Sequence, residues 1–293
     1  MPVTPLELVG LSSLMERTAG RSSVRIGLID GPVLARHPDL VSENVSELSG
    51  SFAGACSRPS SVACLHGTFI AGILAGKRGS PAPAICPGCI LLVRPIFAET
   101  PRGTELMPRA AAWELAAAII ECIDAGARVV NLSLAVASAS VRDEQVLDNA
   151  LGQALRRGVL VVAAAGNQGT LGSSPITRHA WVLPVAACDR RGHPTNDSNL
   201  GSSIGRRGLA APGQAITSLG AQGQPLELGG TSVATPFVTG AIALLCSEFP
   251  AATAAEIKLA LANAHGARRP AVVPPLLDAA AAHRILQTAT GRR

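Results

Sequence analysis

Aromatic residues are scarce in this chain of 293 residues: they make up 2% of it, and tyrosine is absent. Proteins that bind single-stranded nucleic acid stack the bases on such side chains. The formal net charge of +5 is spread along the chain, and basic residues cluster only in short pairs such as Arg156-Arg157. Without aromatic platforms or a basic stripe, we expect no nucleic-acid partner.

The sequence also shows no pattern of a membrane span or an export signal. Apolar runs such as residues 159–165 are far too short to cross a bilayer. The first 20 residues contain neither a basic n-region nor an unbroken apolar h-region, and only 29 residues precede Asp30. We therefore expect a soluble, cytoplasmic protein with no membrane partner, and its oligomeric state stays open.

Clusters of Asp and Asn side chains that would bind calcium are missing as well. We expect neither a required metal nor a cofactor. Apolar residues, in contrast, are abundant: 47% of the chain is hydrophobic and only 15% is charged. A chain of this length and composition can bury a large core and gives little support for long disordered tails.

Short apolar runs alternate with segments of helical spacing along the chain. The runs that we expect as core strands are residues 24–30, 90–93, 128–134, 159–165 and 181–186. The segments that we expect as helices are residues 66–76, 106–125, 143–157, 232–249, 253–264 and 278–288. This alternation predicts a mostly parallel sheet covered by helices, with the functional site at the carboxyl ends of the strands. We assign residues 1–22 to a short N-terminal extension and residues 23–293 to one domain.

Three side chains stand in contexts that suit acyl transfer. A serine hydroxyl is a weak nucleophile, so it needs an imidazole to take its proton and a carboxylate to orient that imidazole. Asp30 ends the first expected strand, His66 opens an apolar helical segment, and Ser232 begins a long apolar helix. The free N–H groups at a helix N-terminus favour developing negative charge, so this is a good place for a nucleophile.

The blocks around these residues resemble the subtilisin (S8) family of serine proteases. IDG at Asp30, HGT at His66 and GTSVATP at Ser232 occur in the family's order, and AAGN ending at Asn167 resembles its oxyanion motif. The resemblance covers nearly the whole chain. It implies a subtilisin-like α/β fold of three αβα layers, and a serine endopeptidase whose triad is Asp30, His66 and Ser232. It also implies that the Asn167 amide donates to the tetrahedral intermediate.

The same resemblance implies where a substrate binds. Ser133, Leu134 and Ala135 resemble the family segment whose backbone pairs with an extended peptide, and Gly166 belongs to the oxyanion block. The glycine pair that commonly follows Leu134 is replaced by Ala135 and Val136. We therefore expect a peptide substrate in extended conformation and a narrower pocket beside the residue that precedes the cut bond.

One departure from the family lies next to the acid. The family usually has Ser or Thr between its Asp and Gly, whereas Gly31 follows Asp30 directly here. Asp39, in the HPDL turn at residues 37–40, is the only nearby rival carboxylate. The departure changes a neighbour of the acid and not the acid itself, so we assign the role to Asp30.

Segments outside these blocks resemble cyanobactin-maturation proteases of the patellamide type; they are residues 84–97, 169–179, 198–201 and 206–213. Such proteases cut a leader from a ribosomally made precursor peptide, and some relatives join the freed ends into a macrocycle. Cyclising relatives carry an inserted helical cover between the Asp and His blocks, whereas Asp30 and His66 are only 36 positions apart here. An uncovered acyl-enzyme favours attack by water, so we predict hydrolysis, with transpeptidation as the alternative.

A different class of function is a non-catalytic scaffold that binds a precursor peptide as an added strand. The presence of Asp30, His66, Asn167 and Ser232 together argues against it, because binding alone requires none of them.

The seven cysteines allow several interpretations, and their odd number leaves at least one thiol without an internal partner. Cys56, Cys64, Cys86 and Cys89 fit two disulfides that tie loops near the site, or four zinc ligands. The CxxC pair at residues 86–89 also fits a redox motif. The spacing is unlike a zinc ribbon, which favours disulfides.

Overall fold

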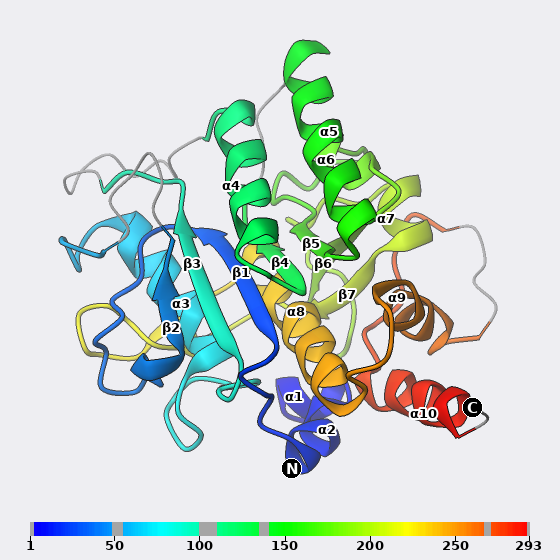
Figure 1. The fold of residues 1–293 in the computed structure, drawn as a ribbon, viewed down its shortest axis with the longest axis horizontal. Helices are drawn as coiled ribbons and strands as arrows, with labels where there is room; N and C mark the ends of the chain where they lie inside the picture. The colour runs from blue at the N-terminus through cyan, green and yellow to red at the C-terminus, as the bar shows by residue number, and fades with distance from the viewer. Residues whose placement is uncertain (1–2, 49–54, 100–109, 135–140, 267–270, 292–293) are drawn as a thin grey trace.

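The computed structural model describes residues 3–48, 55–99, 110–134, 141–266 and 271–291. A seven-stranded parallel sheet lies at the centre of the molecule with helices on both faces (Figure 1). The strands are β1 Arg25–Asp30, β2 Val45–Glu47, β3 Ile90–Pro95, β4 Val129–Leu132, β5 Leu160–Ala164, β6 Val182–Cys188 and β7 Leu209–Pro212. The order across the sheet is β2-β3-β1-β4-β5-β6-β7, and each neighbouring pair is parallel. The predicted subtilisin-like α/β fold is therefore confirmed.

The described residues also form ten α-helices, a 3₁₀ turn and a small hairpin. The helices are α1 Pro5–Leu8, α2 Leu11–Arg17, α3 Val62–Ala75, α4 Ala112–Asp124, α5 Val141–Arg157, α6 Pro175–Arg178, α7 Ser202–Arg207, α8 Thr231–Glu248, α9 Ala254–Asn263 and α10 Ala279–Thr290. The 3₁₀ turn is η1 Ser42–Asn44, and the hairpin joins β8 Ile216–Ser218 to β9 Leu226–Leu228.

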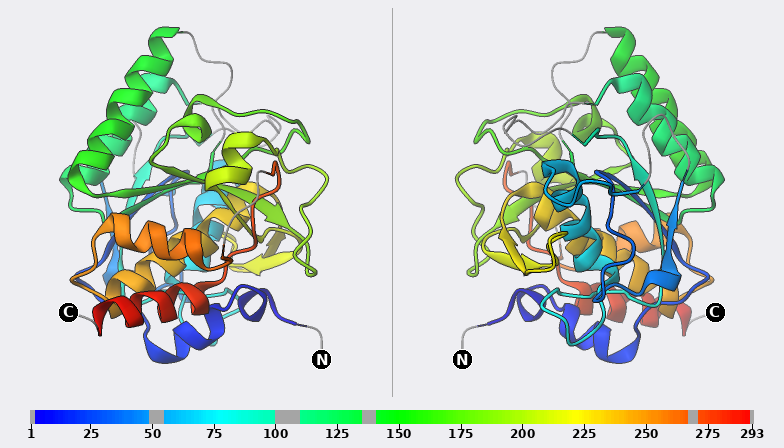
Figure 2. Two further views of the ribbon diagram at one scale, coloured as in Figure 1. Left: turned by 90° about the vertical axis from the view of Figure 1, so that its right-hand side faces the viewer. Right: turned by 90° about the vertical axis from the view of Figure 1, so that its left-hand side faces the viewer.

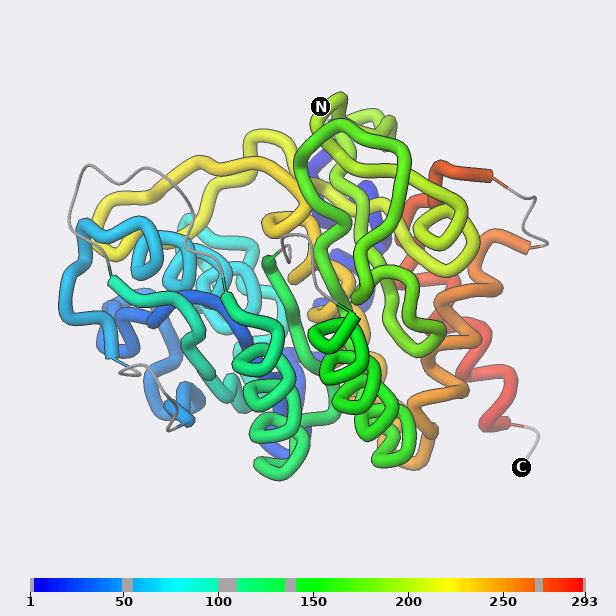
Figure 3. The backbone as a smooth tube through the Cα atoms, turned by 90° about the horizontal axis from the view of Figure 1, so that it is seen from above, coloured from blue at the N-terminus to red at the C-terminus, as the bar shows by residue number. Residues whose placement is uncertain are grey.

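Two hydrophobic cores fill the space between the sheet and its helices. Helices α3 and α8 pack on one face (Figure 2), and α4 and α5 lie side by side on the other (Figure 3). Successive side chains of a strand point to opposite faces, and β5 shows this alternation. Leu160 and Val162 enter the core under α8, whereas Val161 and Ala163 enter the core under α4 and α5.

Helix α8 is the central element of the first core. It is long and apolar enough to cross a membrane by length and composition, but 89% of that window is buried inside the protein. It packs against β4, β5, β6 and β7 and against α3. It is therefore the core helix of a globular domain.

The N-terminal residues belong to the same packed body. Val9, Leu11 and Leu14 are buried in the core that contains α8, and α2 contacts both α8 and α10. The segment that we assigned to an extension therefore lies against the base of the domain, near the C-terminal helix (Figure 1).

The position of the site follows from the strand order. After β1 the chain adds β2 and β3 on one side, and then crosses to add β4 on the other. The crevice between β1 and β4 is thus the topological switch point, where parallel α/β sheets bind their ligands. Asp30 ends β1, and Ser133 follows the end of β4, so both lie at the carboxyl edge of the sheet there.

Candidate active site

Asp30 and His66 form a buried pair at this edge. Helix α3 begins beside the end of β1 because the Ser61 hydroxyl caps it, accepting a hydrogen bond from the Cys64 N–H at 3.2 Å. The cap places His66 on the second turn, where its Nδ1 lies 2.7 Å from Asp30 Oδ1. Asp30 is fully buried and His66 is 8% exposed, so water hardly reaches the bond.

Two glycines allow α3 to lie this close to β1. A Cβ atom at position 31 would lie 2.0 Å from the Ala63 carbonyl oxygen, and one at position 67 would lie 2.4 Å from the Gly31 carbonyl oxygen. The Ser or Thr that the family usually has after its acid would not fit here. Instead, the Gly31 N–H donates to Asp30 Oδ1 at 2.6 Å, so this oxygen is supported, while Oδ2 is buried without a partner among the described residues.

The pKa of His66 is raised above its ordinary value of 6.5. Burial of the ring acts to lower it, but the charge of Asp30 and the hydrogen bond to Asp30 act together to raise it. The other ring nitrogen, Nε2, is buried and has no hydrogen-bond partner among the described residues. Nε2 is the atom with which this general base accepts a proton, because Asp30 holds the opposite nitrogen.

Ser232 lies in the first turn of α8, half-buried, after the N-cap residue Gly230. Helix α8 packs against α3, so the helices that carry Ser232 and His66 are neighbours. The described contacts include no hydrogen bond between these two side chains. The structure therefore brings Asp30 and His66 together directly, and the attack of Ser232 stays a prediction.

Asn167 is held next to Ser232 by Thr231. Its side-chain oxygen accepts hydrogen bonds from the Thr231 N–H at 2.8 Å and the Thr231 hydroxyl at 2.9 Å. The same hydroxyl accepts from the Gly166 N–H at 3.1 Å. With its oxygen fixed in this way, Asn167 keeps its NH₂ group available as a donor, which is the arrangement that an oxyanion site needs.

Gly230 is required for this contact. The φ angle of Gly230 is 114°, in the left-handed region that residues with a side chain rarely adopt. A Cβ atom at this position would also lie 2.9 Å from Asn167 Nδ2. Gly230, two residues before Ser232, therefore lets the loop of Asn167 approach the start of α8.

The predicted substrate-binding residues are only partly described. Ser133 and Leu134 follow β4 at the carboxyl edge and are buried, and Gly166 is buried at the end of the segment after β5. Ala135 lies outside the described residues. The rival carboxylate Asp39 belongs to a separate turn, where its N–H donates to His37 Nδ1 at 3.1 Å.

Two residues that support the site were not predicted. Asn199 accepts hydrogen bonds through its side-chain oxygen from the Gln168 and Thr170 N–H groups, and its own N–H donates to the Gly166 carbonyl. Thr231 links the Asn167 loop to α8. Both stand inside sequence blocks that resemble the family, but their side-chain partners are far away in the sequence and only the fold reveals them.

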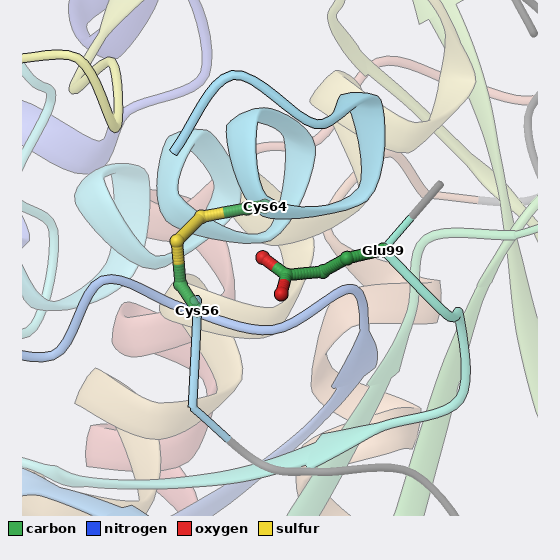
Figure 4. A group of neighbouring side chains, drawn as sticks. All are labelled: Cys56, Cys64 and Glu99. Atoms are coloured by element: carbon green, nitrogen blue, oxygen red, sulfur yellow. A yellow bond between two sulfur atoms is a disulfide. The ribbon is translucent and has the colours of Figure 1, made fainter. Parts of the chain in front are cut away.

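The four cysteines separate into two unlike pairs. Cys56 and Cys64 form a disulfide that ties residues 55–58 to the first turn of α3 (Figure 4). Cys86 and Cys89 are buried free thiols, so the second disulfide is not formed. A hydrogen bond with Cys89 and burial raise the pKa of Cys86 well above its usual range.

The zinc interpretation is not supported either. Within the described ranges, the one group of metal-ligand type is Cys56, Cys64 and Glu99, whose donor atoms lie within 4.8 Å of one another (Figure 4). The two sulfur atoms are bonded to each other and offer no thiolate. The Glu99 carboxylate accepts hydrogen bonds from the Ser57 and Arg58 N–H groups.

The chain is similar to several known proteins. The profile of the subtilase family, Peptidase S8, matches residues 21–284. Subtilisin amylosacchariticus from Bacillus subtilis subsp. amylosacchariticus is 30% identical over 242 residues, which cover 81% of this chain and 59% of that protein. The chain thus spans less than two thirds of that relative's length.

Two solved structures are also similar. A mutant of the protease domain of PatA shares 31% identity, with a TM-score of 0.81 over 92% of this chain and 97% of that one. The prenylagaramide maturation protease PagA shares 27% identity, with a TM-score of 0.80 over 94% of this chain and 98% of that one.

Proposed function

This chain belongs to the subtilase family of serine peptidases, and we propose that it is a serine endopeptidase that cuts the leader from a ribosomally made precursor peptide. The observation that carries the proposal is the 2.7 Å hydrogen bond between Asp30 and His66, beside a partner-free Nε2 atom. A carboxylate that orients an imidazole in this way prepares a general base.

In the proposed mechanism, Ser232 attacks the peptide carbonyl carbon and passes its proton to His66 Nε2. Asp30 keeps the ring oriented and stabilises the imidazolium that forms. The Asn167 amide and the Ser232 N–H donate to the oxyanion, and their positions are set before the substrate arrives. His66 then gives its proton to the leaving amine, and water activated by the same ring hydrolyses the acyl-enzyme.

The substrate class rests on likeness. PagA is a prenylagaramide maturation protease, and the chain aligns with it over nearly its whole length. A precursor peptide in extended conformation would pair with the backbone after β4, at Ser133 and Leu134, on one side and with the Gly166 segment on the other.

We favour hydrolysis over macrocyclisation because of the segment between Asp30 and His66. Between Asp30 and His66, the described residues contain only η1, β2 and the start of α3. No inserted helical cover is present in that described part, which supports attack of water on the acyl-enzyme.

We place the reaction in the cytoplasm, as the lack of a recognisable export signal favours. Five of the seven cysteines are free thiols, which agrees with a reducing compartment, whereas the Cys56–Cys64 disulfide is a bond that such a compartment would reduce.

Mass spectrometry of a candidate precursor peptide tests this proposal. The peptide is incubated with the wild type, with Ser232→Ala, and with Ser202→Ala as a control for loss of an exposed serine at the start of α7. We expect cleavage by the wild type and the control, and a loss of about 10⁶ in kcat for Ser232→Ala, the scale known for subtilisin. A product lighter by one water would indicate cyclisation, and binding without cleavage by any variant would favour the scaffold.

A further inference from the structure

The hydrogen bonding of Ser232 contains a gap that its own helix cannot fill. In an α-helix each carbonyl accepts from the N–H four residues later, and the residue four positions after Ser232 is Pro236. Proline has no N–H, and its ring also pushes the carbonyl four residues earlier outward. The backbone carbonyl of the nucleophile is therefore left without its helical partner.

A side chain from the sheet fills this gap. The Ser133 hydroxyl donates to the Ser232 carbonyl oxygen at 3.0 Å, and Ser133 is 1% exposed. Because the bond reaches from the end of β4 to the first turn of α8, it joins the substrate-binding edge to the residue that carries the nucleophile.

The orientation of that hydroxyl is fixed by two further residues. Asn131 Nδ2 donates to Ser133 Oγ at 2.7 Å, and the Thr239 hydroxyl donates to Asn131 Oδ1 at 2.8 Å. Asn131 and Thr239 are fully buried, where polar groups persist only if they are paired. All three bonds run in one direction, from Thr239 through Asn131 and Ser133 to Ser232, and each strengthens the next.

We propose that Ser133 is a positioning residue for catalysis: its hydroxyl replaces the N–H that Pro236 lacks and fixes the backbone of Ser232 for attack. This inference deepens the proposed function and rests on it, because it concerns how the nucleophile is held. It gives the Ser133 side chain a role separate from the backbone pairing with a substrate. Asn131 and Thr239 serve the same purpose, one and two hydrogen bonds away from Ser133.

The matched control lies on the same helix. The Ser247 hydroxyl also donates to a backbone carbonyl, that of Ala243, at 2.8 Å, and Ser247 is fully buried. It lies 15 residues beyond Ser232, near the far end of α8. Ser133→Ala and Ser247→Ala each remove a buried hydroxyl that donates to a backbone carbonyl of α8, one at the nucleophile and one far from it. Each hydroxyl also accepts one hydrogen bond, from Asn131 Nδ2 and from the Arg21 N–H respectively, so the two losses are similar in size.

The experiment measures three properties of each variant: the rate at which a fluorophosphonate probe labels Ser232, the kcat and KM for peptide cleavage, and the Tm. For Ser133→Ala we expect labelling and kcat to fall about tenfold with KM within about twofold, because one hydrogen bond is lost from the attacking residue and none from substrate binding. For Ser247→Ala we expect a similar fall in Tm with labelling within about twofold of the wild type. Equal labelling rates for the two variants would overturn the proposal.

Three further variants keep the test decisive. Ser133→Thr retains a hydroxyl, and we expect it to label within about threefold of the wild type. Adding Pro236→Ala to Ser133→Ala supplies the missing N–H within the helix, so we expect much of the lost rate to return; no recovery would count against the proposal. Thr239→Val removes the first bond of the chain, and a loss of about threefold is expected even if Ser133→Ala fails to fold.

The outcomes also separate this inference from the proposed function. A wild type that neither reacts with the probe nor cleaves peptides would overturn both. An active wild type, with Ser133→Ala indistinguishable from Ser247→Ala, would overturn only the positioning role.

Discussion

The two halves of the candidate site are built differently. On the nucleophile side, Thr231 binds Asn167, and Ser133 binds the Ser232 carbonyl, so the polar groups are held by partners inside the protein. On the acid–base side, Asp30 Oδ2 and His66 Nε2 are buried without a partner among the described residues. We call the first half saturated because these supporting acceptors are paired, while the Asn167 NH₂ group stays available as a donor. The other half keeps two buried atoms unpaired among the described residues.

The difference has a chemical meaning. Leaving a buried polar atom unpaired costs about 1–3 kcal/mol, so such atoms are rare in native proteins. His66 Nε2 is such an atom at the place where a proton must move, because a base that already holds a partner cannot accept one. The saturated half has the opposite task, since donors that stabilise an oxyanion work best when they do not have to reorient during the reaction.

Of the substitutions that test this comparison, Asp30→Asn should lower kcat the most. The variant keeps the shape of the side chain but presents an amide to His66 Nδ1, which favours the wrong tautomer of the ring. We expect kcat to fall about 10⁴-fold with little change in fold, as judged by the Tm and circular dichroism. Asp39→Asn is the control, and it should retain full activity; a comparable loss there would assign the acid to the rival residue.

Asn167→Leu tests the saturated half. Leucine has nearly the same shape but cannot donate to the oxyanion, so we expect kcat to fall about 10²–10³-fold with KM little changed, the scale known for this residue in subtilisin. Steady-state kinetics on the cleaved peptide give both constants. An effect mainly on KM would mean that Asn167 binds the ground state of the substrate rather than its transition state.

Most of this contrast lies beyond what the sequence can predict. The strands β1, β3, β4, β5 and β6 are apolar runs, and the sequence predicts them because burial on both faces of a parallel sheet requires such runs. The short strands β2 and β7 were missed, because β2 (VSE) has one apolar residue in three and β7 (LAAP) lies between two glycines and ends in proline. Helix α3 begins four residues before the predicted start at His66, where the cap of Ser61 sets it.

The residues of the site divide in the same way. Asp30, His66 and Ser232 stand in contiguous blocks with recognisable composition, so sequence alone selects them. The support from Thr239 to Asn131 joins residues 108 positions apart, and no local pattern encodes that bond. The need for glycine at position 31 is visible only in the structure, where the Ala63 carbonyl leaves no room for a side chain.

The pH dependence of kcat/KM tests His66, on the acid–base side of the site. His66 must be neutral to accept a proton, and its pKa is raised above 6.5. We therefore expect kcat/KM to fall about tenfold per pH unit below a midpoint that lies above 6.5. The stabilising effect of the charged ring on the fold has the opposite dependence: it is fully present below pH 6.5 and is lost as the pH rises through the folded-state pKa. A rate that stays flat from pH 5 to 8 would contradict His66 as the base.

The smallest effect on activity is expected from the disulfide on the acid–base side. Cys56→Ser combined with Cys64→Ala opens a loop with a sequence separation of 8, which lowers the free energy of unfolding by about 2.5 kcal/mol in the chain-entropy treatment. Cys64 is only two residues from His66, yet the ring is held by Asp30 and the helix start by Ser61, so kcat should stay within about twofold.

Denaturant unfolding and kcat per labelled site are measured with and without a dithiol reductant. The wild type should lose stability on reduction, and the double variant should not respond. A large loss of kcat in the variant would show that the covalent link, and not the Asp30 hydrogen bond, positions the base.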